Sequence, residues 1–161
     1  MPSRKSVQNT HNEALLRELH GALVDIVSVM NRPQRDAVMI REAGISLDRA
    51  LFPLLVGIER LGPIGVVDLA DRAGRDHTTV SRQVAKLESL GLVERRPGAT
   101  DRRVREAVVT AEGKAMTDKV DAARNRIGRD IFESWPDEDV QSLVRLMRRF
   151  ADQIKALPDA T

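Results

Sequence analysis

Residues 62–113 constrain the fold of this chain more than any other segment. Their sequence predicts a short helix, a turn at Gly74 and a second helix, followed by two strands joined by an arginine-rich loop. Five arginines fall within eleven residues of the second half: Arg95, Arg96, Arg102, Arg103 and Arg105. A helix sized for the major groove, with a basic hairpin beside it, can hold duplex DNA at two points. The segment therefore indicates a module that binds DNA.

The charge distribution supports this interpretation better than the total charge does. The net charge is only +2, but residues 72–105 carry nine Arg or Lys and four Asp or Glu. The rest of the chain is mildly acidic, with 17 basic and 20 acidic residues. A local basic patch is typical of a surface that binds a polyanion, although a solvated helix face and hairpin would have the same composition.

The length and composition of the chain exclude several other classes of protein. Its 161 residues suffice for one core, or for one domain with a dimerisation extension. The absence of cysteine excludes disulfides, thiolate metal sites and cysteine-based redox sensing. No apolar run approaches the roughly 18 residues that span a bilayer, and the first residues lack the apolar stretch of a signal peptide. We therefore expect a cytoplasmic protein without membrane contact.

The N-terminal part is expected to be helical after a disordered tail at residues 1–9. Thr10 and Glu13 form a capping-box pattern, which predicts a helix from Thr10 to the break at Arg32-Pro33. Its apolar residues recur at helical spacing: Leu15, Leu16, Leu19, Leu23, Ile26, Val27 and Met30.

Two further helices are expected before the central segment. A short one covers residues 35–43 and ends at Gly44. Ser46 is placed to cap the next, which runs to about Leu61 and contains Pro53. A proline inside a helix removes one hydrogen bond, so Pro53 bends or interrupts this helix.

In the central segment, the second helix starts at Asp76, a good N-cap, and Gly91 stops it. Four apolar residues fall on one face of this helix and are expected to pack on the core: Val80, Val84, Leu87 and Leu90. Strands are expected over residues 92–96 and 104–109. Because side chains alternate along a strand, Arg95 and Arg96 cannot both face DNA, and the sequence leaves open which one does.

The C-terminal part carries two more amphipathic helices, separated by Trp135-Pro136. Long apolar stripes at both ends of the chain require a cover. They either pack on each other within one chain or interleave with the stripes of a second copy, and we favour the second arrangement.

The order of elements resembles the multiple-antibiotic-resistance regulator (MarR) family. The residues that carry the resemblance are Gly62-Pro63, DLADRAG at 68–74, TTVSRQVAKLESLGLVERR at 78–96, Asp101 with Arg103, and Thr110 with Gly113. The similarity is strongest over 46–113 and holds by pattern alone at both ends. It implies a mainly α fold with a small β-wing: a winged helix-turn-helix domain over 46–110, and a helical dimerisation region built from residues 10–45 and 111–161.

The resemblance also implies roles for the central residues. The helix after Asp76 would be the recognition helix. His77, Thr78, Ser81 and Arg82 would be candidates for contacts with base edges, with Arg82 the strongest because a guanidinium can bond guanine bidentately. Thr78, Thr79 and Lys86 would hold phosphates. In the wing, Arg103 would enter the minor groove with its side chain held by an ion pair to Asp101, and Arg102 would contact a phosphate.

These expectations favour a sequence-specific regulator, a homodimeric repressor bound to an inverted repeat of double-stranded DNA. The resemblance further implies release by a small aromatic effector. His20, which shares a face with Leu16 and Leu23, is a candidate pocket residue, and a half-buried histidine that packs within the fold is the favoured alternative. The alternative is a winged-helix dimer that acts through protein contacts or by coating DNA without sequence preference.

Enzymatic and metal-dependent functions are not indicated. The sequence has no nucleophile elbow, no Gly-rich phosphate loop and no H-E-x-x-H motif. Its three histidines, His11, His20 and His77, are scattered over different predicted elements, unlike a zinc site. We therefore expect no catalytic residues, no metal and no cofactor.

Overall fold

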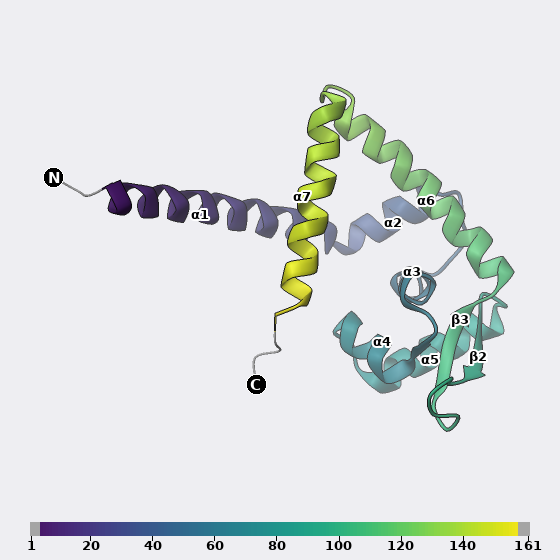
Figure 1. Cartoon of the computed structure of the whole chain (residues 1–161). Helices are drawn as coiled ribbons and strands as arrows, with labels where there is room; N and C mark the ends of the chain where they lie inside the picture. The colour runs from purple at the N-terminus through teal and green to yellow at the C-terminus, as the bar shows by residue number, and fades with distance from the viewer. Residues whose placement is uncertain (1–3, 158–161) are drawn as a thin grey trace. The chain divides into compact units, whose positions relative to one another are not determined.

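The computed structural model of the chain describes residues 4–157, with side chains from Asn12 onward. Its backbone contacts divide the chain into two compact units, Met1–Asp121 and Ala122–Thr161. The structure is mainly helical and contains a small three-stranded antiparallel sheet, which confirms the predicted fold class (Figure 1). In the part of the chain that is described, no helix is long and apolar enough to cross a membrane.

The first helix begins earlier than the sequence predicted. α1 spans Arg4–Met30, so Thr10 lies inside the helix rather than at its N-cap, and residues 4–9 of the expected tail are helical. Residues 1–3 of that tail lie outside the described residues. α2 spans Pro33–Glu42, close to the predicted 35–43, because a proline fits the first turn of a helix, where its missing N–H is not needed.

The third helix starts later than predicted, and Ser46 does not cap it. α3 spans Phe52–Leu61, with Pro53 in its first turn. Before it, the carboxylate of Asp48 accepts a hydrogen bond from the backbone N–H of Ala50 at 2.7 Å and holds a turn. Pro53 therefore begins the helix and neither bends nor interrupts it.

The helix-turn-helix follows the sequence prediction closely. α4 spans Val66–Ala73 and α5 spans His77–Ser89, and both end at a glycine with positive φ, Gly74 (60°) and Gly91 (73°). Their apolar faces meet α3 in one core, whose fully buried larger side chains include Leu54, Leu55, Ile58, Val80, Val84 and Leu87. Leu90 was expected in this core, but it is 45% exposed because α5 ends before it.

The sheet has one strand more than predicted. Its order is β1-β3-β2, where β1 is Ile64–Gly65, β3 is Arg105–Val109 and β2 is Val93–Pro97. All neighbours are antiparallel. β1 is too short for any periodicity in the sequence, and it exists because the backbone of β3 offers it a pairing edge. Together the strands form the wing beside α5 (Figure 1).

The last two helices are close to the prediction. α6 spans Ala111–Phe132 and α7 spans Asp137–Lys155, with Pro136 at the N-cap of α7. At the bend, the rings of Phe132 and Trp135 pack edge to face, with centroids 5.2 Å apart. The helix α7 has no buried residue.

Candidate nucleic-acid interface

The helix α5 is held at its N-terminus by a strong cap. The carboxylate of Asp76 accepts hydrogen bonds from both the backbone N–H and the hydroxyl of Thr79, each at 2.8 Å. These bonds, the backbone one foremost, lower the pKa of Asp76 below its ordinary value of 3.8. The first turn of α5 is therefore fixed. The hydroxyl of Thr79, predicted to hold a phosphate, is engaged in this cap.

The exposed side of α5 lies opposite its buried face. With Val80, Val84 and Leu87 directed into the core, helical periodicity places Thr78 and Arg82 on the far side of the helix. The side chains of Thr78, Arg82 and Lys86 are exposed. This arrangement brings together the predicted base-reading arginine and two predicted phosphate contacts on one solvent-facing surface.

Two other predicted contact residues lie at the edge of that surface. His77 is exposed, and its Nε2 lies 2.9 Å from Oδ1 of Asp71 in α4, so the imidazole is tied to the preceding helix. Ser81 is half-buried. Asp71 was not predicted to contact His77, because this contact spans the turn between the two helices.

In the wing, Arg95 and Arg96 point in different directions; the sequence had left open which of them faces outward. Arg95 is directed back to α5, where its Nε donates to Glu88 at 3.0 Å, and its side chain is only 25% exposed. Arg96 is 66% exposed and pairs with Glu94 on its own strand. Arg95 thus joins the wing to α5, and Arg96 is the one that faces solvent. Glu88 was not singled out from the sequence.

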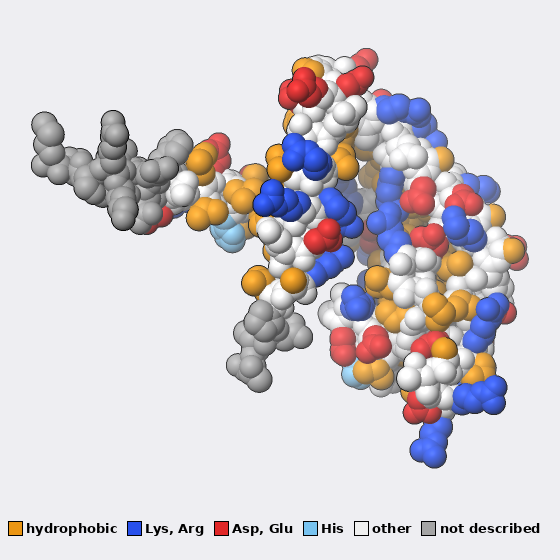
Figure 2. Space-filling model, in the orientation of Figure 1, with side chains coloured by type: hydrophobic (Ala, Val, Ile, Leu, Met, Phe, Trp, Pro, Cys, Tyr) orange, Lys and Arg blue, Asp and Glu red, His pale blue; other side chains and the backbone are white. Residues whose placement is uncertain are grey.

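The tip of the hairpin carries the other predicted wing residues. Asp101, Arg102 and Arg103 are all exposed, and Figure 2 shows Lys and Arg side chains projecting where Figure 1 places the loop between β2 and β3. The carboxylate of Asp101 accepts a hydrogen bond from the backbone N–H of Arg103 at 2.9 Å. The described contact is therefore with the backbone of Arg103, whereas the expected ion pair was with its guanidinium.

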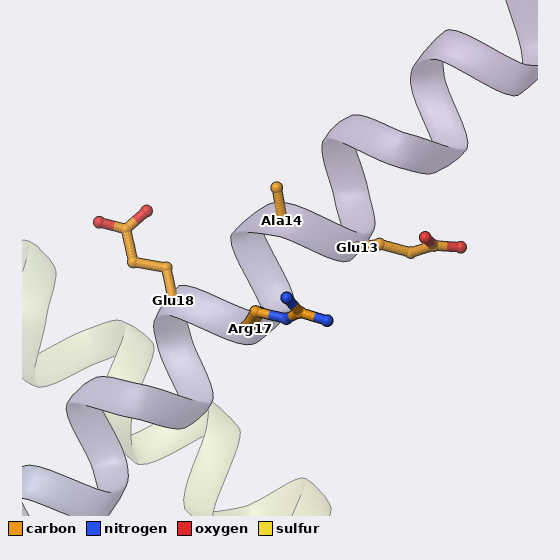
Figure 3. A pocket seen from close by; sticks show the side chains of 4 residues that line it. All are labelled: Glu13, Ala14, Arg17 and Glu18. Atoms are coloured by element: carbon orange, nitrogen blue, oxygen red, sulfur yellow. The ribbon is translucent and has the colours of Figure 1, made fainter.

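A hollow of about 610 Å³ lies beside α5 on the side away from the wing. It is bordered by the start of α2 and the α2–α3 loop, and by Arg75, Thr79 and Gln83. His20, the predicted pocket residue, is exposed and does not border it. A second hollow is lined by Glu13, Ala14, Arg17 and Glu18, whose side chains project to different sides of α1 (Figure 3). Among the described residues, no group of three or more His, Asp or Glu could hold a metal ion.

The packed helix-turn-helix and its basic wing define a winged helix-turn-helix protein. The MarR family model matches residues 47–104, the segment that contains α3, α4, α5 and most of the wing. This segment is therefore similar to the MarR family of transcriptional regulators.

Individual proteins are similar to the chain in sequence or in fold. The uncharacterized HTH-type transcriptional regulator YxaD of Bacillus subtilis (strain 168) is 28% identical over 104 residues, which cover 65% of this chain and 73% of YxaD. A solved MarR family protein from Bacillus stearothermophilus superposes with a TM-score of 0.71 at 22% identity, covering 89% of this chain and 97% of that one. CouR from Rhodococcus jostii RHA1, solved with p-coumaroyl-CoA, has a TM-score of 0.58 at 24% identity and coverages of 88% and 94%.

Proposed function

We propose that this regulator is a homodimeric, sequence-specific repressor in the cytoplasm that binds an inverted repeat. The observation that carries the proposal is the surface shared by Thr78, Arg82 and Lys86 on α5, opposite the buried face and beside a basic wing. Two such surfaces on a two-fold axis would meet half-sites about one helical turn, roughly 10 bp, apart. Occupation of the repeat would then exclude polymerase from a promoter.

On α5, Arg82 is the residue that reads a base. Its exposed guanidinium can donate two parallel hydrogen bonds to guanine, which contributes roughly 1–3 kcal/mol of discrimination. Thr78 and Lys86 hold phosphates on either side of it, with Thr79 limited by its bond to Asp76. His77 and Ser81 remain candidates for base edges at the rim.

In the wing, Arg103 enters the minor groove, where a narrow A·T-rich segment concentrates negative potential. Asp101 supports this contact by fixing the backbone of Arg103. Arg102, exposed at the same tip, contacts a phosphate. The wing and α5 would thus hold the duplex in two adjacent grooves.

Dimerisation is supported by the apolar stripes that each unit leaves open. On α1 the exposed large apolar side chains are Leu15, Leu16, Leu19, Val24, Ile26, Val27 and Met30, and on α7 they are Val144, Leu146, Met147 and Ile154. Figure 2 shows hydrophobic side chains on the visible faces of both helices. A monomer rarely exposes so much apolar surface, and a second copy of the same chain covers it by burying both stripes.

Release by a small aromatic effector is the regulatory part of the proposal. CouR, a structural neighbour, is bound to p-coumaroyl-CoA. In this chain the hollow between the start of α2 and α5 would accept such a compound, because it is polar at Arg75 and Asp36 and borders the recognition helix directly. A ligand lodged there would displace α5 from its DNA-binding position.

The first experiment is a selection of genomic fragments by the purified full-length protein at physiological salt, followed by sequencing. We expect an enriched inverted repeat with half-sites one turn apart. The Arg82→Ala variant should lose preference at one guanine of each half-site, whereas Lys86→Ala should weaken binding to all fragments alike and lower the salt dependence by about one phosphate contact.

Enrichment without a shared motif would reject the repressor proposal. It would favour the alternative of a winged-helix dimer that coats DNA or acts through protein contacts, and Arg82 would then be a phosphate contact.

A further inference from the structure

Arg75 joins three parts of the DNA-binding domain that are separate in sequence. It lies in the turn between α4 and α5, and its backbone N–H donates to the carbonyl of Ala70 at 3.0 Å. Its guanidinium Nη1 donates to the backbone carbonyl of Ala50 at 3.0 Å and lies 3.3 Å from Oε1 of Gln83. The side chain therefore connects the turn, the α2–α3 loop and the middle of the recognition helix.

The anchor in the loop is itself fixed. The N–H of Ala50 is held by the carboxylate of Asp48, and its carbonyl is held by Arg75. The peptide units on both sides of Ala50 are therefore engaged in hydrogen bonds. This loop leads into α3, whose Leu54, Leu55 and Ile58 belong to the core against which α5 packs. The guanidinium thus ties α5 to a point that cannot shift without disturbing the core.

On α5, the residue that Arg75 contacts is next to Arg82, the proposed base-reading residue. Gln83 follows Arg82 directly and lies on the flank between the buried face and the exposed face. The apolar contacts of Val80 and Val84 are non-directional and allow small rotations of the helix. A charged hydrogen bond at the flank is directional and resists such a rotation.

We propose that Arg75 is a positioning residue that sets the rotation of α5 about its axis and thereby aims Arg82 at its base. Arg75 acts through Gln83 and contacts no DNA. Its guanidinium is half-buried between the loop and the helix, on the flank that faces the hollow rather than on the surface shared by Thr78 and Arg82. The inference rests on the proposed sequence-specific binding, because aiming matters only where a base is read.

The test compares Arg75→Lys, Arg75→Gln and Gln83→Leu in the full-length protein on the selected repeat and on a duplex of unrelated sequence. Lysine keeps the positive charge, but its side chain is one atom shorter and ends in a strongly hydrated ammonium on a flexible stem, so it does not hold both acceptors in the same geometry. We expect both Arg75 variants to lose about tenfold in affinity for the repeat, with little loss on the unrelated duplex. The slope of log affinity against log salt should stay that of the wild type, since no phosphate contact is removed.

The second arm is a double-mutant cycle. Gln83→Leu removes the acceptor on α5, and its effect should overlap with that of Arg75→Gln, so that the double variant loses less than the product of the two single losses. Arg49→Gln serves as the matched control, because Arg49 is exposed and borders the same hollow. Far-UV circular dichroism and thermal unfolding establish that each variant is folded, and a variant that fails this check is replaced by Gln83→Leu alone.

Four outcomes would overturn the inference. Full binding by Arg75→Lys, or a salt slope reduced by about one, would make Arg75 a phosphate contact. Equal losses on both duplexes would mean that Arg75 only supports folding, and unchanged binding by Gln83→Leu would remove the route through Gln83. Failure of the wild type to select a repeat would instead reject the proposed function itself.

Discussion

At the scale of single residues, Gly113 is a position where the backbone leaves no space for a side chain. A Cβ built there would lie 2.0 Å from the carbonyl oxygen of Leu92. Gly113 also donates its N–H to the hydroxyl of Thr110 at 3.1 Å, while that hydroxyl donates to the carbonyl of Gly91 at 2.6 Å. The start of α6 is therefore pressed against the start of β2 at this point, which gives a physical reason for the Thr110-x-x-Gly113 pattern.

The Gly113→Ala variant should destabilise the protein by about 1–3 kcal/mol, because the added methyl group forces α6 away from the strand. Urea unfolding followed by circular dichroism would measure the loss. Gly128→Ala is the matched control: it lies inside α6, a Cβ there meets nothing within 4 Å, and alanine in a helix should be neutral or stabilising by up to about 1 kcal/mol. Equal effects of the two variants would show that the close approach at Gly113 is absent in solution.

The same scale shows what the sequence could not determine in the site. Arg95 and Arg96 are adjacent and chemically identical, and the register of β2 in the folded sheet places Arg95 where it meets Glu88 of α5. The bond between Arg75 and Gln83 likewise depends on how the turn places a long side chain. Such contacts follow from tertiary geometry and leave no periodic signal. Asp76, by contrast, was predictable as a cap, because an N-cap depends on local backbone geometry alone.

At the scale of one element, α5 depends on the charge of its cap. The pKa of Asp76 is lowered in the folded chain, chiefly by the N–H of Thr79, so the carboxylate stabilises the fold at a pH above the ordinary value of 3.8. This contribution is lost as the pH falls through the lowered pKa, since the protonated cap accepts hydrogen bonds less well.

We therefore expect the difference in thermal midpoint between the wild type and Asp76→Asn to be largest at a pH above the ordinary value of 3.8, and to shrink as the pH falls through the lowered pKa of Asp76. Asparagine keeps an oxygen acceptor, so the comparison isolates the charge. Thr79→Val should remove only part of the pH-dependent difference, because it keeps the backbone N–H. A difference that is the same at every pH would contradict a charged cap.

The wing is the second element whose role can be measured separately. Arg103→Ala should weaken binding to the repeat by at least about tenfold while helicity and dimerisation stay unchanged, because an arginine in a narrow minor groove loses a strong electrostatic contact. Arg96→Ala is the control from the same hairpin, since Arg96 is exposed but paired with Glu94. Fluorescence anisotropy with labelled duplex would measure both affinities. The wing assignment would be wrong if Arg103→Ala bound as tightly as the wild type.

Element boundaries were predictable where local signals were strong. Gly74, Gly91 and Asp76 fixed α4 and α5, because a left-handed glycine and a capping carboxylate act on the backbone directly. The predicted start of α3 after Ser46 was wrong. The carboxylate of Asp48 binds the backbone N–H of Ala50 and holds a turn there, so the helix begins only at Phe52, next to Pro53. β1 was missed, since a two-residue strand is formed only by its partner β3.

At the scale of the whole molecule, the apolar stripes decide whether the protein works as a dimer. Val27 is 52% exposed on the apolar side of α1, while its neighbour Ser28 lies about 100° further round the helix and donates its hydroxyl to the carbonyl of Asp25. Introducing glutamate at Val27 and, separately, at Ser28 therefore compares the effect of the same charge at two positions around the helix.

If a second copy covers α1, Val27→Glu buries an unpaired carboxylate and should raise the dimer dissociation constant by at least about a hundredfold. Sedimentation velocity would detect monomers at micromolar concentration. When the dimer dissociates, binding of Val27→Glu to the full repeat should also weaken, because the two recognition helices then bind independently. Binding to a single half-site should change little.

Ser28→Glu introduces the same charge one residue away and should leave the dimer intact. If both variants were equally dimeric, the stripe on α1 would be covered within its own chain, and two-fold recognition of an inverted repeat would need another interface. If both were equally monomeric, the introduced charge would act on the helix as a whole rather than on one face. The pair of variants thus connects the exposed stripe of a single helix to the symmetry of the DNA that the regulator is proposed to bind.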